Sequence, residues 1–254
     1  MSRLPKSTPS PGPGPAFGKN LALMYLSSPA LPIGGFAWSR GLEAAVHSGT
    51  LQTLEDLFDF LALGLTHSLG RLDLPLLGLA LQAAASYDYG ALSELNDLSL
   101  AARESLEFAL EETEGGKAAK RLALSLGLWP EGMDPDFAPG LTVGQALLAV
   151  ALGLGPADAL PVLECFAFAW LQNQIAAAAR TMKLGQSQLQ GLLLALGPTV
   201  SEVALQAADL GLGRTDPARP SLAEIAQAAI GPGLPGLAIL SAHHESQAGR
   251  LFRS

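Results

Sequence analysis

The 254-residue sequence predicts an all-α fold, a single globular domain of roughly eight to ten helices. Alanine and leucine dominate a composition that is 49% apolar and only 6% aromatic, which favours helices over strands. No stretch alternates like a half-buried strand, and apolar residues instead recur at the spacing of one helix face. Three such faces are Leu51, Leu54, Leu57, Phe58 and Leu61; Leu92, Leu95, Leu98, Ala102, Leu106 and Ala109; and Val200, Val203, Ala204 and Ala207.

Helix starts are marked by hydroxyl residues followed three positions later by a carboxyl or amide side chain, an arrangement that caps open backbone N–H groups. Three pairs have this pattern: Thr53 with Asp56, Thr142 with Gln145, and Ser221 with Glu224. Helix breaks are predicted where glycine and proline cluster. These places are Gly115 and Gly116, the segment 129–140, Gly155 and Pro156, Gly197 and Pro198, and residues 231–233.

The chain divides into three parts. Residues 1–18 are predicted to be a disordered leader, because five prolines stand there among serine and glycine. Residues 19–240 form the helical domain, and residues 241–254 form a C-terminal tail. The leader lacks the apolar stretch of a signal peptide, and no run reaches the ~18 uninterrupted apolar residues of a membrane span. We therefore expect a cytoplasmic protein that does not bind membranes.

Composition and motifs argue against several functions. A net charge of −8 disfavours a nucleic-acid binder, and the single cysteine, Cys165, allows neither an internal disulfide nor a cysteine-based zinc site. Glu111 stands where a phosphate-binding loop ending at Gly116 and Lys117 requires glycine. No hydrolase elbow or zinc-protease helix is present. We predict no catalytic residues, no cofactor and no resident metal.

Acidic residues gather in two places. Glu107 and Glu111 lie one helical turn apart, with Glu112 and Glu114 close by, so paired carboxylates for acid–base chemistry are one interpretation. A solvated helix face is the favoured interpretation. The segment 129–140 also carries carboxylates but lacks a calcium-loop pattern, and we expect a solvated loop there.

Residues 28–43 are unlike ordinary helical sequence. Two prolines end the preceding helix, and Gly34 and Gly35 permit a tight bend. Phe36 and Trp38 supply large apolar side chains, and Ser39 is a candidate cap for the next helix. The segment is either a rigid turn with two core aromatics, which the residues alone favour, or a partner-binding loop.

The C-terminal tail is the second unusual segment. Arg250 and Arg253 flank Leu251 and Phe252 at the end of an acidic chain. Arginine and phenylalanine are frequent interface anchors, so the tail is either a peptide that orders on binding a partner or a frayed terminus.

Together these two segments resemble the two ends of the UreF family of urease accessory proteins. The early family motif is matched by Ser28, Pro29, Leu31, Pro32, Gly34, Phe36, Ser39, Gly41, Leu42 and Glu43. The closing motif is matched by His244, Glu245, Gln247, Arg250, Leu251, Phe252, Arg253 and Ser254. Ala248 and Gly249 depart from the family's usual tyrosine and serine, which predicts weaker docking of the tail. Looser landmarks between the ends are Arg103 and Glu104, Gln172 and Asn173, and residues 184–186.

The resemblance implies an all-helical homodimer that binds UreD (called UreH in some systems). That pair would form a platform for the GTPase UreG, which delivers nickel to the urease apoprotein. The matched residues of both motifs would contact partners, with Arg250 and Arg253 meeting acceptors and Leu251 and Phe252 entering an apolar groove.

Two alternatives remain open. The chain could itself be a nickel-binding metallochaperone with His243, His244 and Glu245 as ligands, although adjacent histidines bind weakly unless further ligands converge. It could also regulate GTP hydrolysis, for example with an inserted arginine, but no pattern distinguishes Arg40 or Arg103 for that role.

Overall fold

The computed structural model describes residues 18–212 and 233–253, and within these ranges the chain forms helices and no strand. The predicted all-α fold is confirmed. The leader up to residue 17, the cap at Ser221 and Glu224, and Gly231 and Pro232 lie outside the described residues. The α-helices are α1 (Lys19–Leu26), α2 (Leu42–His47), α3 (Leu54–Leu63), α4 (Asp73–Ala85), α5 (Tyr89–Ala101), α6 (Leu106–Ser125), α7 (Leu141–Ala151), α8 (Ala159–Thr181), α9 (Gln186–Ala195), α10 (Gly197–Leu212) and α12 (Pro235–Glu245). Short 3-10 helices form η1 (Gly35–Ala37), η3 (Leu69–Arg71) and η4 (Pro156–Asp158), and a π-helix forms η2 (Gly64–Ser68).

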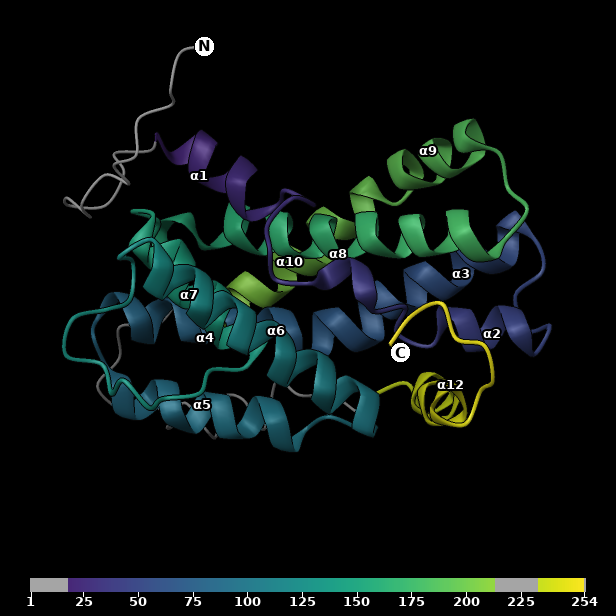
Figure 1. Ribbon diagram of the computed structural model, residues 1–254. Helices are drawn as coiled ribbons and strands as arrows, with labels where there is room; N and C mark the ends of the chain where they lie inside the picture. The colour runs from purple at the N-terminus through teal and green to yellow at the C-terminus, as the bar shows by residue number, and fades with distance from the viewer. Residues whose placement is uncertain (1–17, 213–232, 254) are drawn as a thin grey trace, which may run out of the picture.

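Helix α4 is the centre of the core. It packs against α5, α7, α8 and α10, and most of its side chains are buried, so it is apolar on every face rather than on one stripe. In Figure 1, α6 and α7 cross in front of α4, and α8 runs along the other side of the bundle. Helix α12 lies at one end of the molecule against α2 and α6, where it delivers the C-terminal tail.

The predicted helix starts were right at one position and wrong at another. Thr53 begins α3 with both hydrogen bonds of the capping pair, to and from Asp56. Thr142 does not begin a helix, because α7 starts at Leu141 with Gly140 in the cap position. Thr142 is instead buried, and its backbone N–H donates to Glu112 at 2.9 Å.

The predicted break at Gly115 and Gly116 is wrong, since α6 continues through both glycines to Ser125. The glycines permit a close approach of the chain that leads into α7. A Cβ atom on Gly116 would collide with the carbonyl oxygen of Pro139, and one on Gly115 would come within 3.0 Å of Leu141.

The apolar series from Leu92 to Ala109 was predicted as one helix face, but it is divided between two helices, because Ser105 caps the start of α6. The breaks at 129–140, at Gly155 and at Gly197 are confirmed.

One helical stretch of 24 residues, Gln186–Asp209, has the length and composition of a membrane span, and so do α7 and α8 when the bent pair is counted together. Core helices of soluble proteins meet the same criterion. Here Leu189, Val200 and Val203 of that stretch are buried in the core. That the protein does not bind membranes stays a prediction.

Candidate functional site

The segment 28–43, which we call the bend, turns sharply between α1 and α2. Gly34 and Gly41 have φ angles of 80° and 81°, which favour glycine, and Arg40 between them has φ 46°. Trp38 is buried, whereas Phe36 is 62% exposed, so only one of the two predicted core aromatics is in the core. The predicted cap at Ser39 is wrong, because Gly41 stands in the cap position of α2; the Ser39 hydroxyl only accepts a long hydrogen bond of 3.4 Å from the N–H of Glu43.

Residues 241–245 of the predicted tail belong to α12. The residues after them, 246–253, are called the tail from here on; they return from α12 and lie against the bend (Figure 1). The backbone N–H groups of Leu251 and Phe252 donate to the two carboxylate oxygens of Glu43 at 2.8 and 3.0 Å. The N–H of Arg253 donates to the carbonyl oxygen of Ala37 at 2.8 Å. The two segments that resemble the family motifs, about 200 residues apart in sequence, are therefore in direct contact within one chain.

A buried histidine joins the helices beneath this contact. The Nε2 atom of His244 lies 2.9 Å from Glu43, and its Nδ1 atom lies 2.8 Å from Glu107. His244 is fully buried, and Ser241 bonds both Ser105 at 2.7 Å and Glu107 at 3.4 Å. One imidazole thus ties α12 to both α2 and α6.

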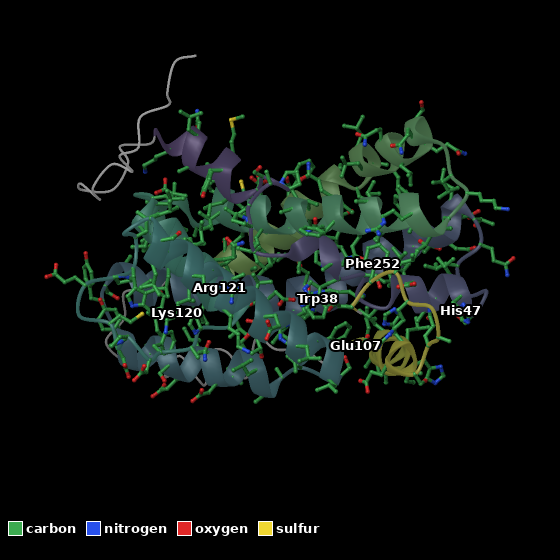
Figure 2. All side chains as sticks on the ribbon, viewed as in Figure 1. Trp38, His47, Glu107, Lys120, Arg121 and Phe252 are labelled. Carbon is green, nitrogen blue, oxygen red and sulfur yellow. The ribbon has the colours of Figure 1, made fainter. Side chains whose placement is uncertain are left out.

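Side chains of the tail add further contacts. Phe252 is buried, and the guanidinium of Arg180 lies 4.7 Å from the centre of its ring. Arg253 lies over Trp38 at 6.0 Å, and Arg250 forms a half-exposed ion pair with Glu107 at 3.3 Å. Figure 2 shows Trp38, Glu107 and Phe252 gathered on the side of the molecule where the tail lies.

A buried ion cluster continues from the bend into the core. Arg40 pairs with Glu111 at 2.7 Å and with Asp73 at 3.2 Å. Arg103 pairs with Asp73 at 2.8 Å and with Glu112 at 2.8 Å. Asp73 therefore bridges the two arginines, and the cluster links the bend to α4, to α6 and to the turn between α5 and α6. Arg40 and Arg103 are already committed to these pairs, which disfavours either as an inserted arginine for a GTPase.

The charges perturb one another. Burial alone would raise the pKa of Asp73, but Arg103 and Arg40 outweigh it and hold the pKa of Asp73 below its ordinary value. Burial raises the pKa of Glu111, because Arg40 offsets only part of the desolvation. Burial would likewise raise the pKa of Glu43, but hydrogen bonds from Leu251, His244 and Phe252 lower it overall.

The interpretation of the acidic run as a solvated helix face is wrong for three of its four members. Glu107, Glu111 and Glu112 are buried, and only Glu114 lies at the surface, where it pairs with Lys117. Their buried partners are His244 of α12, Arg40 of the bend, and Arg103 in the turn between α5 and α6. No sequence pattern indicated these partners: Arg40 is 71 residues from Glu111 and His244 is 137 residues from Glu107, and only Arg103 is near in sequence, nine residues from Glu112.

The candidate nickel ligands do not converge. Both ring nitrogens of His244 face carboxylates, while His243 and Glu245 are exposed. Across residues 18–212 and 233–253, no group of three or more histidine, cysteine, aspartate or glutamate side chains is arranged to hold a metal ion.

The residues predicted to bind partners fall into two groups. Glu43, His244 and Phe252 are buried in the contact between tail and bend, as are Leu31, Ser39, Gly41 and Leu42 around it. The exposed or half-buried group consists of Pro29, Pro32, Gly34, Phe36, Glu245, Gln247, Arg250, Leu251 and Arg253. Sequence reasoning missed Glu107 and Arg180, which hold the tail from α6 and α8. No spacing pattern connects either residue to the tail.

Fold and site together define a class of protein: a helical body whose distinctive residues fix its own C-terminus in place, with no metal cluster in the described part. Comparison with known proteins specifies the family. The UreF family model matches residues 51–197. The chain belongs to the UreF family of urease accessory proteins, as its two end motifs predicted.

Individual relatives match along nearly the whole chain. A protein of Marinomonas sp. (strain MWYL1) named urease accessory protein UreF is 39% identical over 236 residues, which cover 92% of this chain and 94% of that protein. The protein of the same name from Chromohalobacter salexigens is 40% identical over 232 residues, covering 91% and 93%. That from Teredinibacter turnerae is 39% identical over 239 residues, covering 92% and 98%.

Proposed function

We propose that the chain is a non-catalytic scaffold for urease maturation. Acting as a cytoplasmic homodimer with UreD, it recruits the GTPase UreG and the urease apoprotein so that nickel is inserted into the urease active site. Its membership of the urease accessory family supports the maturation role. The particular partners follow from the family resemblance of its two ends.

The observation that carries the proposal is the docked tail. Glu43, His244 and Phe252 are buried beneath it, and Arg250, Leu251 and Arg253 remain at the surface. Because Arg253 bonds to Ala37, the exposed ring of Phe36 lies near the same surface. Exposed arginines beside apolar side chains have the composition of an interface anchor.

The proposal gives the motif residues two different roles. The buried members position the tail, and the exposed members contact UreD. This division refines the expectation that Phe252 enters a groove on the partner, because its ring is already packed within the chain against Arg180.

A test uses two leucines of similar exposure. Leu251→Asp alters the tail surface, and Leu205→Asp on α10 is the matched control, since the two side chains are 56% and 51% exposed. We expect Leu251→Asp to weaken capture of UreD roughly tenfold or more and to reduce nickel-dependent activation of urease. Leu205→Asp should change neither measurement.

Undiminished capture and activation with Leu251→Asp would contradict the proposed surface. If the wild-type chain neither captured UreD nor supported activation, the proposed function itself would be wrong. The rate of GTP turnover by UreG, measured alone and with the complex, gives the sign of any regulation.

A further inference from the structure

A second surface lies at the opposite end of the molecule from the tail. The loop between α6 and α7, at the left in Figure 1, borders an open pocket of about 500 Å³. We call it the Tyr87 pocket, and its walls include Tyr87, Leu128, Trp129, Pro130, Glu131 and Val150. Its volume lies within the range of pockets that bind side chains or small ligands.

Tyr87 is held in an unusual conformation at the edge of this pocket. Its φ angle is 57°, which is uncommon for a residue other than glycine, and its side chain is 67% exposed. Backbone hydrogen bonds from Tyr87 to Ala84 and from Asp88 to Ala83 fix this turn. The ring meets Tyr89 edge to face at 6.4 Å. The structure thus maintains a strained turn that presents an aromatic ring to solvent.

The loop that forms the other edge is also fixed. Lys120 donates to the carbonyl oxygens of Pro135 and Phe137 at 2.6 and 2.7 Å, and its ammonium lies 5.1 Å from the centre of the Trp129 ring. The hydroxyl of Tyr89 donates to the carbonyl oxygen of Glu131 at 2.8 Å. A surface held in place in this way loses little conformational freedom when it binds.

The loop that borders the pocket is acidic: Glu131 lines the pocket, and Asp134 and Asp136 follow it in the same loop. Glu131, Asp134 and Asp136 are exposed, and none of the three takes part in an ion pair among the described residues. Lys120, the nearby cation, is bonded to backbone carbonyls instead. Apolar side chains of Leu124 and Leu126 are 53% and 47% exposed close to the same loop. Aromatic and apolar walls beside unpaired carboxylates are complementary to an apolar residue next to a lysine or arginine.

We infer that the Tyr87 pocket binds a segment of another protein of the maturation assembly, in which an apolar or aromatic side chain enters the pocket and a neighbouring lysine or arginine pairs with Glu131 or Asp134. This inference rests on the proposed scaffold function. Because the pocket and the tail lie at opposite ends, the chain could hold two different proteins at once (Figure 1).

The test combines charge reversal with hydrogen exchange. UreD, UreG and the urease apoprotein are added in turn to the full-length chain, and exchange is followed at Tyr87 and in residues 127–131. One of these proteins should slow exchange there. The double variant Glu131→Lys with Asp134→Lys should lower the affinity for that protein roughly tenfold. The matched control, Glu55→Lys with Asp59→Lys on the exposed side of α3, should leave it unchanged.

Three results would overturn the inference. In the first, no added protein slows exchange at the pocket, and in the second, the double variant binds as tightly as the control. In the third, removal of residues 2–17 speeds exchange at the pocket in the isolated chain, which would identify residues 2–17 as the occupant. If the double variant still binds UreD through the tail and supports urease activation, the proposed function stands while this inference fails.

Discussion

The two halves of α6 make buried contacts of opposite kinds. Its first two turns bury Glu107, Glu111 and Glu112 against His244, Arg40 and Arg103 from three other segments. The next turn buries Gly115 and Gly116 against the chain entering α7. The charged half packs against its partners through directed hydrogen bonds and ion pairs. The glycine half packs against the chain entering α7 only because its glycines leave room for a close approach. The charged half is also the one that supports the tail, because Glu107 bonds His244 and pairs with Arg250.

The largest expected effect comes from breaking the buried ion cluster that includes Glu111 and Glu112 of the charged half, at Asp73 of α4. Asp73→Ala removes the carboxylate between Arg40 and Arg103 and leaves two buried guanidinium groups near each other. We expect the free energy of unfolding to fall by about 4 kcal/mol, since each buried arginine loses one of its two carboxylate partners and keeps only Glu111 or Glu112. Urea denaturation measures the change. Asp97→Ala on the exposed face of α5 is the control, and an equal loss in both variants would show that the cluster contributes little.

A somewhat smaller effect is expected in the glycine half. Gly116→Ala places a methyl group against the Pro139 carbonyl, and the backbone must move to relieve the collision. We expect a loss of about 3 kcal/mol, near the upper end of the cost of overpacking. Gly191→Ala in α9 has open space around the added methyl group and should instead stabilise the helix by up to about 1 kcal/mol. Similar results for the two variants in urea denaturation would contradict close packing at Gly116.

The smallest expected effect is local and depends on pH. The pKa of Glu43 is lower in the folded chain than its ordinary value of 4.5, so the docked tail is stabilised at neutral pH. This stabilisation is fully present above the ordinary pKa and is lost as the pH falls through the lowered value. Hydrogen-exchange protection of the Leu251 and Phe252 amides should therefore decrease on acidification, after correction for intrinsic rates. Glu43→Gln should show weaker protection without that pH dependence, and an identical profile in both proteins would refute the assignment.

Local features of the fold could be predicted because their causes are local. The cap at Thr53 depends on a residue three positions away, and the break before Gly197 falls where the neighbouring glycine and proline predicted it. The glycines at 115 and 116 were misinterpreted because glycine has two uses, and only the position of α7 decides between a break and a close approach.

The candidate site could be located but not assembled from the sequence. The motifs indicated the bend and the tail, yet the contact between Glu43 and Leu251 joins residues 208 apart. Glu107 was assigned to a solvated face, because glutamate is seldom buried unless a partner is present, and its partner His244 is 137 residues away. Long-range partners of this kind leave no periodic signal along the chain.

The Glu43 carboxylate binds backbone N–H groups of the tail, and this determines which amino acids are tolerated in the tail. Any amino acid with a backbone N–H can donate these hydrogen bonds from position 251 or 252. Proline is the one amino acid that cannot, because it lacks the N–H. Ala248 and Gly249, the two positions without the usual tyrosine and serine, lie outside these bonds, and Gly249 has a φ angle of 72° that a serine would adopt only with strain. The two substitutions thus affect the conformation of the loop between α12 and the bend, whereas the hydrogen bonds from residues 251 and 252 to Glu43 do not depend on them.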